Sequence, residues 1–525
     1  MGDIFTFALE GGLNLEAGPS VPAVVREGNI IPVPWLVLVE NVVYNFDGWP
    51  QKMPGASNVN STATGAAHHV NGLFDYWRSG SGATAVQQRI VYSDTQIYSE
   101  SAGVLTSIKT GLEASMMPWF EVMNDVLVIA TSSSTDVPMT WNQTTFANLG
   151  GSPPNFDFHV EHKGRMWAAG VDANKSRLYY TVSGNQADWT GSGSGSIDVT
   201  PDDGDVITGL RSHNNELVGF KGPNKGAILR ITGSSPTGSD AFALHPFVRG
   251  VGATNQQGII ARGGDLLFVD NFGLHSLQAT DTFADYAPAF LSAPIASYFT
   301  SLLNHSRFAF VWGAYFAAKS LALWTFSRLG ATTNNLIITL DFRFSPPRFA
   351  FWPAYSVASL AMVLDSANES VPWAGTYTGR AMRLNRPARN IAGAAYRATT
   401  RLPYVGLSDP FLDKTLIKGR VSVSPKGVTP FTVGWQRDGN TQQTASVNQG
   451  GVSTLGPSSD QFTLDSLTAG VLAGGRHVPQ FFEMEGSCKE VQIELTQGTL
   501  DVDFEPHSMA IDVEGAGMGT VQTLG

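Results

Sequence analysis

Two histidines, His159 and His162, with Glu161 between them, are residue types that zinc prefers as ligands. Histidines three residues apart share a metal ion when they lie on a helix, which brings both side chains to one face. Here the residues alternate along an expected strand and reach its turn, so their rings should point to opposite faces. The sequence therefore predicts no metal site at this place. His68 and His69, in a loop rich in Gly, Ala and Asn, are expected to face solvent.

Three carboxylates are concentrated in the run Pro201–Asp205, where Asp202, Asp203 and Asp205 could hold calcium. Calcium loops supply about six to eight oxygens from a longer alternating acidic pattern, with a central glycine and a distal glutamate. This run stops too early for that pattern, and an acidic hairpin turn is the prediction. Replacing any one of the three by asparagine is accordingly expected to leave folding intact.

Glycosidases work through two carboxylates that flank a sugar, and several of them are propellers. The string Ser183–Trp189 resembles the Asp-containing turn of sialidases, which would also need a cluster of pocket arginines. Arg165, Arg177, Arg211 and Arg230 lie within or beside separate hairpins and share no spacing. The sequence contains no G-x-S-x-G elbow, P-loop or H-E-x-x-H motif. We therefore expect no enzyme activity, no catalytic residue, no metal and no cofactor.

A dense group of aromatic residues could form a carbohydrate-binding surface. Its alternation along expected strands favours burial in the core or in a subunit interface. The group consists of Trp312, Tyr315, Phe316, Trp324, Phe326, Phe342, Phe344, Phe349, Phe351 and Trp352.

A locally basic stretch follows the aromatic group. It forms either a solvated linker face or a docking surface for an acidic neighbour, and the sequence leaves both open. Its arginines are Arg343, Arg348, Arg380, Arg383, Arg386, Arg389, Arg397 and Arg401.

Composition indicates an all-β protein of two or three domains. The chain has 525 residues, of which 42% are hydrophobic and 15% charged, and 56 glycines and 28 prolines punctuate short runs of β-branched and aromatic residues. Cys488 is the one cysteine, which excludes a disulfide framework within the chain and a cysteine-based zinc site. The net charge of −11 argues against tight nucleic-acid binding. With no apolar run of membrane-helix length and no signal-peptide pattern, we expect a soluble protein made in the cytoplasm.

A hairpin pattern recurs about every 30 to 50 residues, which is the blade period of a β-propeller. A four-stranded blade cannot bury both of its faces alone, so blades pack face to face and close into a circle. A β-sandwich, the competing interpretation, lacks this longer period. The repeats lie at residues 89–98, 120–129, 156–181, 206–231 and 258–277, with fainter ones at 308–353 and 357–384.

The sequence predicts three regions: an extended N-terminal segment at residues 1–45, a β-propeller at 46–400 and a C-terminal β-sandwich at 401–525. Strict alternation at 420–424, 431–435 and 491–495 indicates the strands of the sandwich. Residues 284–304 are the best helix candidate, although Pro288 and Pro294 should restrict the helix to short pieces.

Several strings resemble the tail-nozzle, or tail-hub, propeller proteins of short-tailed bacteriophages. The strings are Asn45–Trp49 with Lys52–Gly55, His162–Gly170, Tyr179–Ser183 with Asp188–Trp189, Asp202–Leu210, Asp265–Leu277, and Leu340–Arg343 with Arg348–Trp352. The resemblance covers residues 40–420, and it rests on the order of the strings. The first 40 residues match nothing in this family, and the C-terminal region matches more loosely.

The resemblance implies a structural virion protein without enzyme activity or cofactor. Such a subunit forms a homohexameric ring that binds the head–tail adaptor and tail fibre or needle proteins, and DNA passes through the lumen without specific binding. The protein would be assembled in the host cytoplasm and located in the virion tail. The alternative is a carbohydrate-binding or glycan-cleaving β-propeller of a receptor-recognising tail component.

Overall fold

The computed structural model describes residues 3–18, 20–22, 30–32, 35–65, 68–79, 86–277, 289–406, 413–424, 429–449 and 478–515. The chain divides into two compact units. The first unit is Met1–Ala56, Thr339–Ala354 and Asn385–Gly525, and the second unit is Ser57–Ile338 and Tyr355–Leu384. Among the described residues, no helix has the length and apolar character needed to cross a bilayer.

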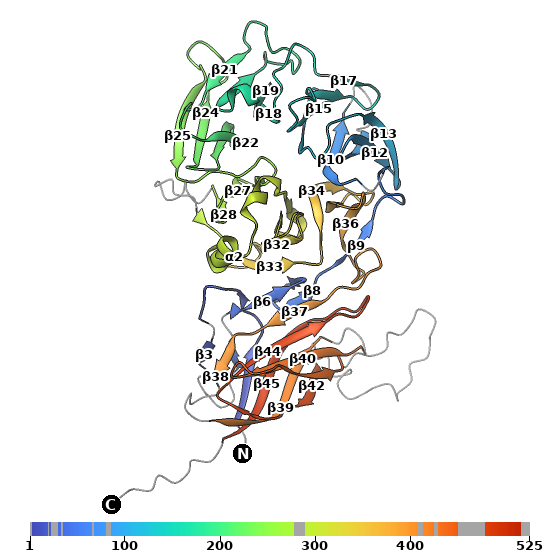
Figure 1. Cartoon of the computed structure of the whole chain (residues 1–525), viewed down its shortest axis with the longest axis vertical. Coiled ribbons are helices and arrows are strands. Elements are labelled where there is room, and N and C mark those ends of the chain that lie inside the picture. Colours follow the sequence, from blue (N-terminus) through green and yellow to red (C-terminus); the bar gives the residue numbers. More distant parts are fainter. Residues whose placement is uncertain are drawn as a thin grey trace, which may run out of the picture. The chain divides into compact units, whose positions relative to one another are not determined.

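Most of the second unit consists of four-stranded antiparallel sheets that follow one another along the chain (Figure 1). The first sheet is β10 (Val70–Arg78), β11 (Val86–Ser93), β12 (Gln96–Ser101) and β13 (Val104–Thr110), and the second is β14 (Pro118–Met123), β15 (Val126–Thr131), β16 (Met139–Trp141) and β17 (Phe146–Asn148). The third is β18 (Phe158–His162), β19 (Arg165–Ala169), β20 (Arg177–Tyr180) and β21 (Gly195–Asp198).

Two further sheets of the same kind follow along the chain. The fourth is β22 (Val206–His213), β23 (Glu216–Gly222), β24 (Ala227–Thr232) and β25 (Ala243–Arg249), and the fifth is β26 (Ile260–Arg262), β27 (Asp265–Val269), β28 (Leu274–Ser276) and β29 (Ala289–Phe290). The sixth group is β30 (Gly313–Phe316), β31 (Leu321–Phe326) and β32 (Leu336–Asp341). In the last sheet, β34 (Val357–Leu364), β35 (Ser370–Thr376) and β36 (Ala381–Arg386) are joined by β9 (Gly55–Asn58).

Two-residue turns explain why the first two strands of a sheet form a tight hairpin. The turns Asn124–Asp125, Lys163–Gly164 and Asn214–Asn215 have φ values between 47° and 70° at both positions. Positive φ at both central residues gives a turn whose twist matches the right-handed twist of the strands. The register is regular up to each turn, as in the pairing of Met123 with Val126 and of His162 with Arg165.

The sheets of the second unit follow one another in a circle. The first strands of successive sheets are neighbours, from β10 to β14, β18 and β22, and again from β26 to β30 and β34, and β34 lies beside β10. Figure 1 shows the sheets arranged around a common centre. The prediction of an all-β chain is confirmed, and the arrangement is propeller-like.

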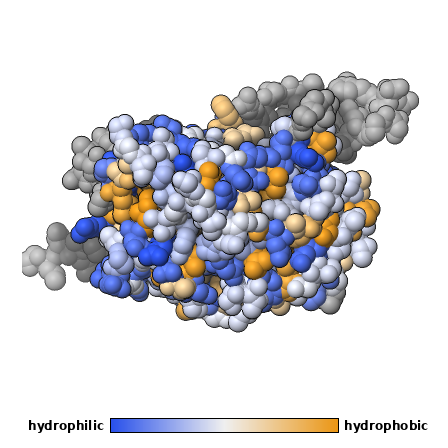
Figure 2. Space-filling view, turned by 90° about the horizontal axis from the view of Figure 1, so that it is seen from above, coloured by the Kyte–Doolittle hydropathy of each residue, from blue (hydrophilic) through white to orange (hydrophobic). Residues whose placement is uncertain are grey.

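Apolar clusters fill the spaces between neighbouring sheets, because both faces of each sheet need to be covered. The cluster between the last and first sheets contains Trp373 and Val363 on one side and Val70 and Leu73 on the other. The Ser359 hydroxyl also donates to the Val70 carbonyl at 2.7 Å. The last sheet is therefore packed directly against the first. On the face seen in Figure 2, hydrophobic residues are scattered among polar ones.

In the part of the chain that the structure describes, helical structure is limited to short pieces, as the prolines predict. The helix expected at residues 284–304 is reduced to α2 (Ala296–Ser301), preceded by the 3₁₀ turn η3 (Ala293–Ile295). Pro294 lies in the first turn of η3, where a missing N–H costs nothing. Residues 284–288 of the expected helix, including Pro288, lie outside the described residues. The other 3₁₀ turns are η2 (Asp172–Asn174), η4 (His305–Phe310) and η5 (Ala317–Lys319).

The first unit contains two larger sheets. One has the order β4 (Ile30–Pro32), β1 (Asp3–Ala8), β45 (Pro506–Gly515), β39 (Lys414–Val423) and β42 (Val478–Glu483), with β43 (Ser487–Cys488) beside β39. The other includes β3 (Ser20–Pro22), β38 (Tyr404–Gly406), β44 (Glu490–Gln497), β37 (Ala398–Arg401), β6 (Leu38–Glu40) and β33 (Arg348–Trp352), with β40 (Phe431–Arg437) and β41 (Gln443–Val447) attached through β44. Two-stranded pairs are β2 (Gly12–Leu13) with β5 (Trp35–Leu36), and β7 (Val42–Tyr44) with β8 (Pro50–Lys52).

The N-terminal segment takes part in these sheets. β1 pairs antiparallel with β45 over six residues, with Phe5 opposite Ile511, and β3 pairs parallel with β38. The three alternating stretches of the sequence form β39, β40 and β44. Buried and more exposed residues alternate along much of β39, whereas β44 is buried on both faces from Ile493 onward. Cys488 is fully buried, and burial raises the pKa of its thiol to about 12.

Candidate functional site

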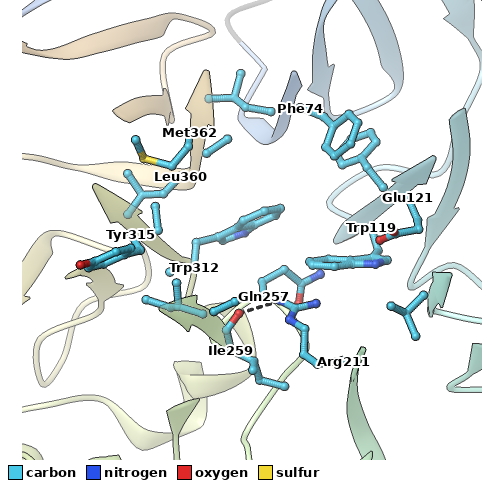
Figure 3. Close-up of a pocket in the computed structure, with 18 of the residues that line it drawn as sticks. Phe74, Trp119, Glu121, Arg211, Gln257, Ile259, Trp312, Tyr315, Leu360 and Met362 are labelled. Atoms are coloured by element: carbon cyan, nitrogen blue, oxygen red, sulfur yellow. Dashed lines mark hydrogen bonds between the residues drawn. The ribbon is translucent and has the colours of Figure 1, made fainter. Parts of the chain in front are cut away.

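A cavity of about 620 Å³ lies where the first strands of the sheets of the second unit converge. Every sheet contributes to it, because the first strand of each sheet presents side chains to the common centre (Figure 3). Its lining residues are Leu73, Phe74, Trp119, Phe120, Glu121, Val160, Glu161, Arg211, Ser212, Gln257, Ile259, Ile260, Ala261, Trp312, Gly313, Ala314, Tyr315, Leu360, Ala361 and Met362. We call this the central cavity.

Two tryptophans from different strands project into the central cavity (Figure 3). Trp119 on β14 is fixed by a hydrogen bond from its Nε1 to the His159 carbonyl at 2.7 Å. Trp312 directly precedes β30 and is buried. Phe74 and Phe120 stack on each other in the same wall, with ring centroids 5.4 Å apart. The cavity therefore offers flat apolar surfaces that are held in fixed positions.

Arg211 on β22 is the cation of the central cavity. Its Nη2 donates to the carbonyls of Ile259 at 2.6 Å and Gln256 at 3.0 Å, and its guanidinium lies 4.4 Å from the centre of the Trp119 ring. Burial lowers the pKa of Arg211 to about 10, against the opposing effect of the Glu121 charge. The guanidinium is therefore charged at neutral pH and rigidly oriented.

Glu121 on β14 is the carboxyl group beside this cation. Burial raises its pKa to about 7; the charge of Arg211 acts to lower the pKa and that of Glu161 to raise it. Near neutral pH the group is consequently present both as an acid, which donates a hydrogen bond, and as a carboxylate, which only accepts. An arrangement of this kind can bind hydroxyl groups, which both donate and accept.

The histidines of the 159–162 run are separated, as their alternation predicts. His159 is fully buried, and its Nε2 lies 3.2 Å from the Val128 carbonyl; burial lowers its pKa to about 3. His162 faces another way, with its Nδ1 2.8 Å from the Ser212 hydroxyl. No group of three His, Cys, Asp or Glu side chains in the described ranges could hold a metal ion. His68 is only partly solvent-exposed, with its Nδ1 2.7 Å from Asp94.

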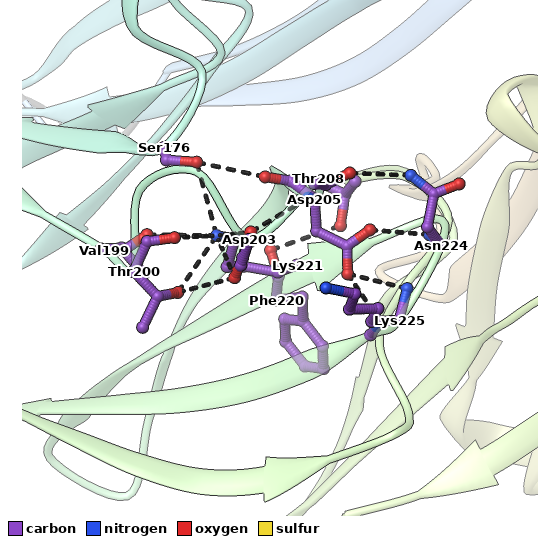
Figure 4. Close-up of polar contacts among 12 residues, drawn as sticks. Ser176, Val199, Thr200, Asp203, Asp205, Thr208, Phe220, Lys221, Asn224 and Lys225 are labelled. Atoms are coloured by element: carbon purple, nitrogen blue, oxygen red, sulfur yellow. Dashed lines mark hydrogen bonds and ion pairs between the residues drawn. The ribbon is translucent and has the colours of Figure 1, made fainter.

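Asp203 of the acidic run pairs with a buried lysine, Lys221, that the sequence did not reveal (Figure 4). Lys221 has 0% exposure, and its Nζ lies 2.8 Å from each carboxylate oxygen of Asp203. It also donates to the Val199 carbonyl and to both oxygens of Thr200. One feature of the sequence could have revealed that Lys221 is buried. This lysine directly follows the apolar run Leu217–Phe220, in the middle of a sheet.

Asp205 is also occupied by donors from the chain, which argues against a calcium loop. Its carboxylate accepts backbone hydrogen bonds from Asn224, Lys225 and Gly226 at 2.7 to 2.9 Å (Figure 4). The expectation that asparagine at position 203 leaves folding intact is corrected, because it would weaken the partner of a buried ammonium group.

The four arginines considered for a sialidase pocket do not converge. Arg165 donates to the Thr181 and Gly193 carbonyls, Arg177 pairs with Asp198, and Arg230 pairs with Glu216. Of these four, Arg211 alone lines the central cavity.

The basic stretch and the aromatic group are largely engaged within the chain. Five of the eight arginines of the basic stretch form ion pairs within the chain. These pairs are Arg343 with Asp341, Arg383 with Asp365, Arg389 with Asp503, and both Arg397 and Arg401 with Glu494. Most of the aromatic group is buried, as alternation predicts, but Trp312 and Tyr315 line the central cavity.

The solved structures to which the chain is similar include the following weak likenesses. No family model matches the chain, and no curated protein matches it. One similar solved structure is the exo-β-1,3-galactanase of Phanerochaete chrysosporium with galactose, at 11% identity and a TM-score of 0.28, covering 88% of this chain and 100% of that chain. Another is BBS1N in complex with ARL6DN, soaked with mercury, at 11% identity and a TM-score of 0.27, covering 64% of this chain and 92% of that chain.

The galactanase in this comparison corrects the prediction that the chain is not an enzyme. That prediction rested on the absence of local motifs, whereas glycosidases are defined by two carboxylates placed in space by the fold. A missing motif therefore excludes no activity of this kind. At a TM-score of 0.28 the likeness assigns no activity either. The tail-nozzle resemblance is untested by these comparisons and stays a prediction.

Proposed function

We propose that the second unit is a β-propeller that binds carbohydrate in its central cavity. The observation that carries this proposal is that Trp119 and Trp312 project into the same cavity in which Glu121 and Arg211 supply charged hydrogen-bonding groups. Sugars present apolar C–H faces, which pack on aromatic rings, and hydroxyl groups, which pair with carboxylates and guanidinium groups. The cavity volume of about 620 Å³ falls within the range of ligand pockets.

The rigidity of the site supports ligand binding rather than filling by mobile side chains. Arg211 is held by two carbonyls and Trp119 by one, so neither loses much conformational freedom when a ligand enters. Ordering such side chains on binding otherwise costs about 0.5–1.5 kcal/mol each.

A glycan array with the purified full chain tests the proposal. We expect retention of at least one glycan class, and at least a tenfold loss of affinity in Tyr315→Ala, which removes a ring at the cavity wall. Trp77→Ala is the matched control, because Trp77 is an aromatic residue of the same unit that is 38% exposed and does not line the cavity. Equal weakening by both variants would contradict a site in the central cavity.

A second candidate function is a subunit of a bacteriophage tail ring. Its support is the position of the resembling strings: His162–Gly170 covers the β18–β19 hairpin, Asp202–Leu210 leads into β22, and Asp265–Leu277 spans β27 and β28. The strings thus fall on successive sheets and keep their order along the chain, although they cover different strands in each sheet. In this role the chain forms a homohexamer in the virion tail, with a head–tail adaptor and tail fibres or needle as partners and DNA passing through the lumen.

Native mass spectrometry of the purified chain tests the second candidate. We expect a hexamer, or a hexamer once the adaptor is added. A monomer under both conditions would contradict it. The two candidates are compatible, since a tail component can recognise a receptor glycan.

A further inference from the structure

A serine and a histidine form a pair at the wall of the central cavity. Ser212, near the end of β22, is exposed and lines the cavity, whereas His162, at the end of β18, is 4% exposed. The Ser212 Oγ lies 2.8 Å from His162 Nδ1. This is the hydrogen-bond distance expected between a nucleophile and its general base.

Two neighbouring hairpins bring the pair together. His162 directly precedes the Lys163–Gly164 turn, and Ser212 lies two residues before the Asn214–Asn215 turn. Their strands, β18 and β22, are adjacent first strands of successive sheets. Neither residue belongs to a loop, so the pair is held by the sheets themselves.

The His162 imidazole is neutral, so one of its ring nitrogens can accept a proton. Burial, and next the charge of Lys163, lower its pKa to about 4, so the ring is neutral at physiological pH. Its Nε2 is buried and has no hydrogen-bond partner among the residues that the structure describes. A ring with its hydrogen on Nε2 leaves Nδ1 free to accept the hydroxyl proton of Ser212.

A backbone N–H of Ser212 itself is placed to stabilise negative charge. On β22 the backbone groups of Leu210 face away from β23. Its N–H donates to the Gln256 side-chain oxygen at 2.6 Å, and its C=O accepts from the Gln256 side-chain amide at 3.0 Å. Residues two apart on a strand direct their backbone groups to the same edge. The Ser212 N–H therefore points to the inner edge of β22, on the side of the central cavity.

We propose that Ser212 is a nucleophile, with His162 as its base, that removes ester-linked acyl groups from the carbohydrate bound in the central cavity. The carbohydrate part of this inference rests on the proposed function, whereas the reactive serine does not. The substrate class is an O-acylated sugar, whose ester carbonyl meets Ser212 while its ring packs on the aromatic wall.

The reaction is a hydrolysis in two steps. Ser212 Oγ bonds to the ester carbonyl carbon while its proton passes to His162 Nδ1, and the Ser212 N–H stabilises the oxyanion. The bond to the sugar oxygen breaks, and that oxygen takes the proton from the imidazolium. Water then attacks the acyl-serine and gives its proton to the same nitrogen. The carboxylic acid leaves, and Ser212 recovers its proton.

Labelling with a fluorophosphonate tests the nucleophile without a known substrate, because the reagent forms an Oγ–P bond and releases fluoride. We expect the intact mass of the full chain to rise by one adduct, located at Ser212 by peptide mapping. Ser212→Ala should give no adduct, and His162→Asn should react at least 100-fold more slowly. Ser101→Ala, at an exposed serine of the same unit outside the cavity, should react like the unchanged chain.

Two results would overturn the inference: an unreactive unchanged chain, or undiminished labelling of Ser212→Ala. Circular dichroism of each variant shows whether loss of labelling reflects loss of folding, and Ser212→Ala, which removes one hydroxyl, should keep the fold. Glycan retention separates the two proposals. A chain that retains glycans but takes no label refutes the nucleophile alone, and a labelled chain that retains none refutes carbohydrate binding.

Discussion

Lys221 is fully buried and Glu121 is half-buried, and the two groups affect stability differently because their partners differ. Lys221 is fully surrounded by oxygens, whereas Glu121 faces a cavity and has a raised pKa of about 7. A satisfied buried charge contributes to stability through its partners, and removing one partner is costly. A carboxyl group with a raised pKa instead makes stability depend on pH.

Replacing Glu121 by glutamine should remove a pH-dependent loss of stability. The pKa is raised from 4.5 to about 7 in the folded chain, so the favourable neutral form is fully present below pH 4.5 and is lost as the pH rises through 7. Relative to Glu121→Gln, the free energy of unfolding of the unchanged chain should fall by up to about 3 kcal/mol between pH 4.5 and pH 8.

Urea unfolding at a series of pH values measures this difference. Glu369→Gln, at an exposed glutamate of the same unit, is the control and should keep the pH profile of the unchanged chain. A constant difference between the unchanged chain and Glu121→Gln across this pH range would show that Glu121 is not in the environment described.

Lys221→Met should destabilise the second unit by about 1–3 kcal/mol, because Asp203 and the Val199 and Thr200 carbonyls lose their hydrogen-bond donor. Lys225→Met, four residues further on and exposed, should change stability by less than about 0.5 kcal/mol. Hydrogen bonds from Lys221, the Asp205 N–H and Thr200 outweigh desolvation and hold the pKa of Asp203 at about 2. The stabilisation should therefore persist in acid and disappear only as the pH falls through 2. Equal effects of both lysine variants in urea unfolding would refute the network.

For individual residues, the sequence predicted on which face of a strand a side chain lies, but it did not predict which side chains contact each other. The opposite orientation of His159 and His162 follows from the period of a strand, and it is found. The pairing of Lys221 with Asp203, or of His162 with Ser212, depends on how separate hairpins are placed, and no local pattern encodes that. The central cavity was missed for the same reason, since its residues come from every sheet of the second unit.

The sheets were the most predictable part of the molecule. Turn residues such as Asn124–Asp125 and Lys163–Gly164 adopt the positive φ values that a tight hairpin needs, and the strands around them were expected. The strand β9 was not recognised as part of the last sheet, because β36 and β9 are more than 300 residues apart. The local sequence of a strand does not indicate a pairing partner that lies so far away in the chain.

Gly375→Ala should test the packing of the last sheet on the first. A Cβ at Gly375 would lie 2.2 Å from the Val70 carbonyl oxygen and 2.3 Å from the Ser359 hydroxyl, so the two sheets would have to separate. We expect a loss of about 2–3 kcal/mol in urea unfolding. Gly65→Ala, where a Cβ meets open space, should stay within about 0.5 kcal/mol of the unchanged chain. If Gly375→Ala were equally tolerated, the circle of sheets would not be closed at this point.

The first unit contains strand pairings between residues that lie far apart in the chain. β1 pairs with β45 in the first unit, about 500 residues further along the chain, and β3 pairs with β38. Composition and alternation predicted strands near the C-terminus, but they could not predict that N-terminal residues complete the same sheets. Contacts of such long range are decided by the assembled fold, not by any stretch of sequence.

Calorimetric titration with the glycan selected on the array measures most directly whether the central cavity binds carbohydrate. We predict saturable binding of one glycan per chain by the unchanged protein, at least a tenfold weaker Kd for Tyr315→Ala, and an unchanged Kd for Trp77→Ala. Tenfold corresponds to about 1.4 kcal/mol of binding free energy. Absence of heat with every glycan class, or the same Kd in Tyr315→Ala, would contradict the account.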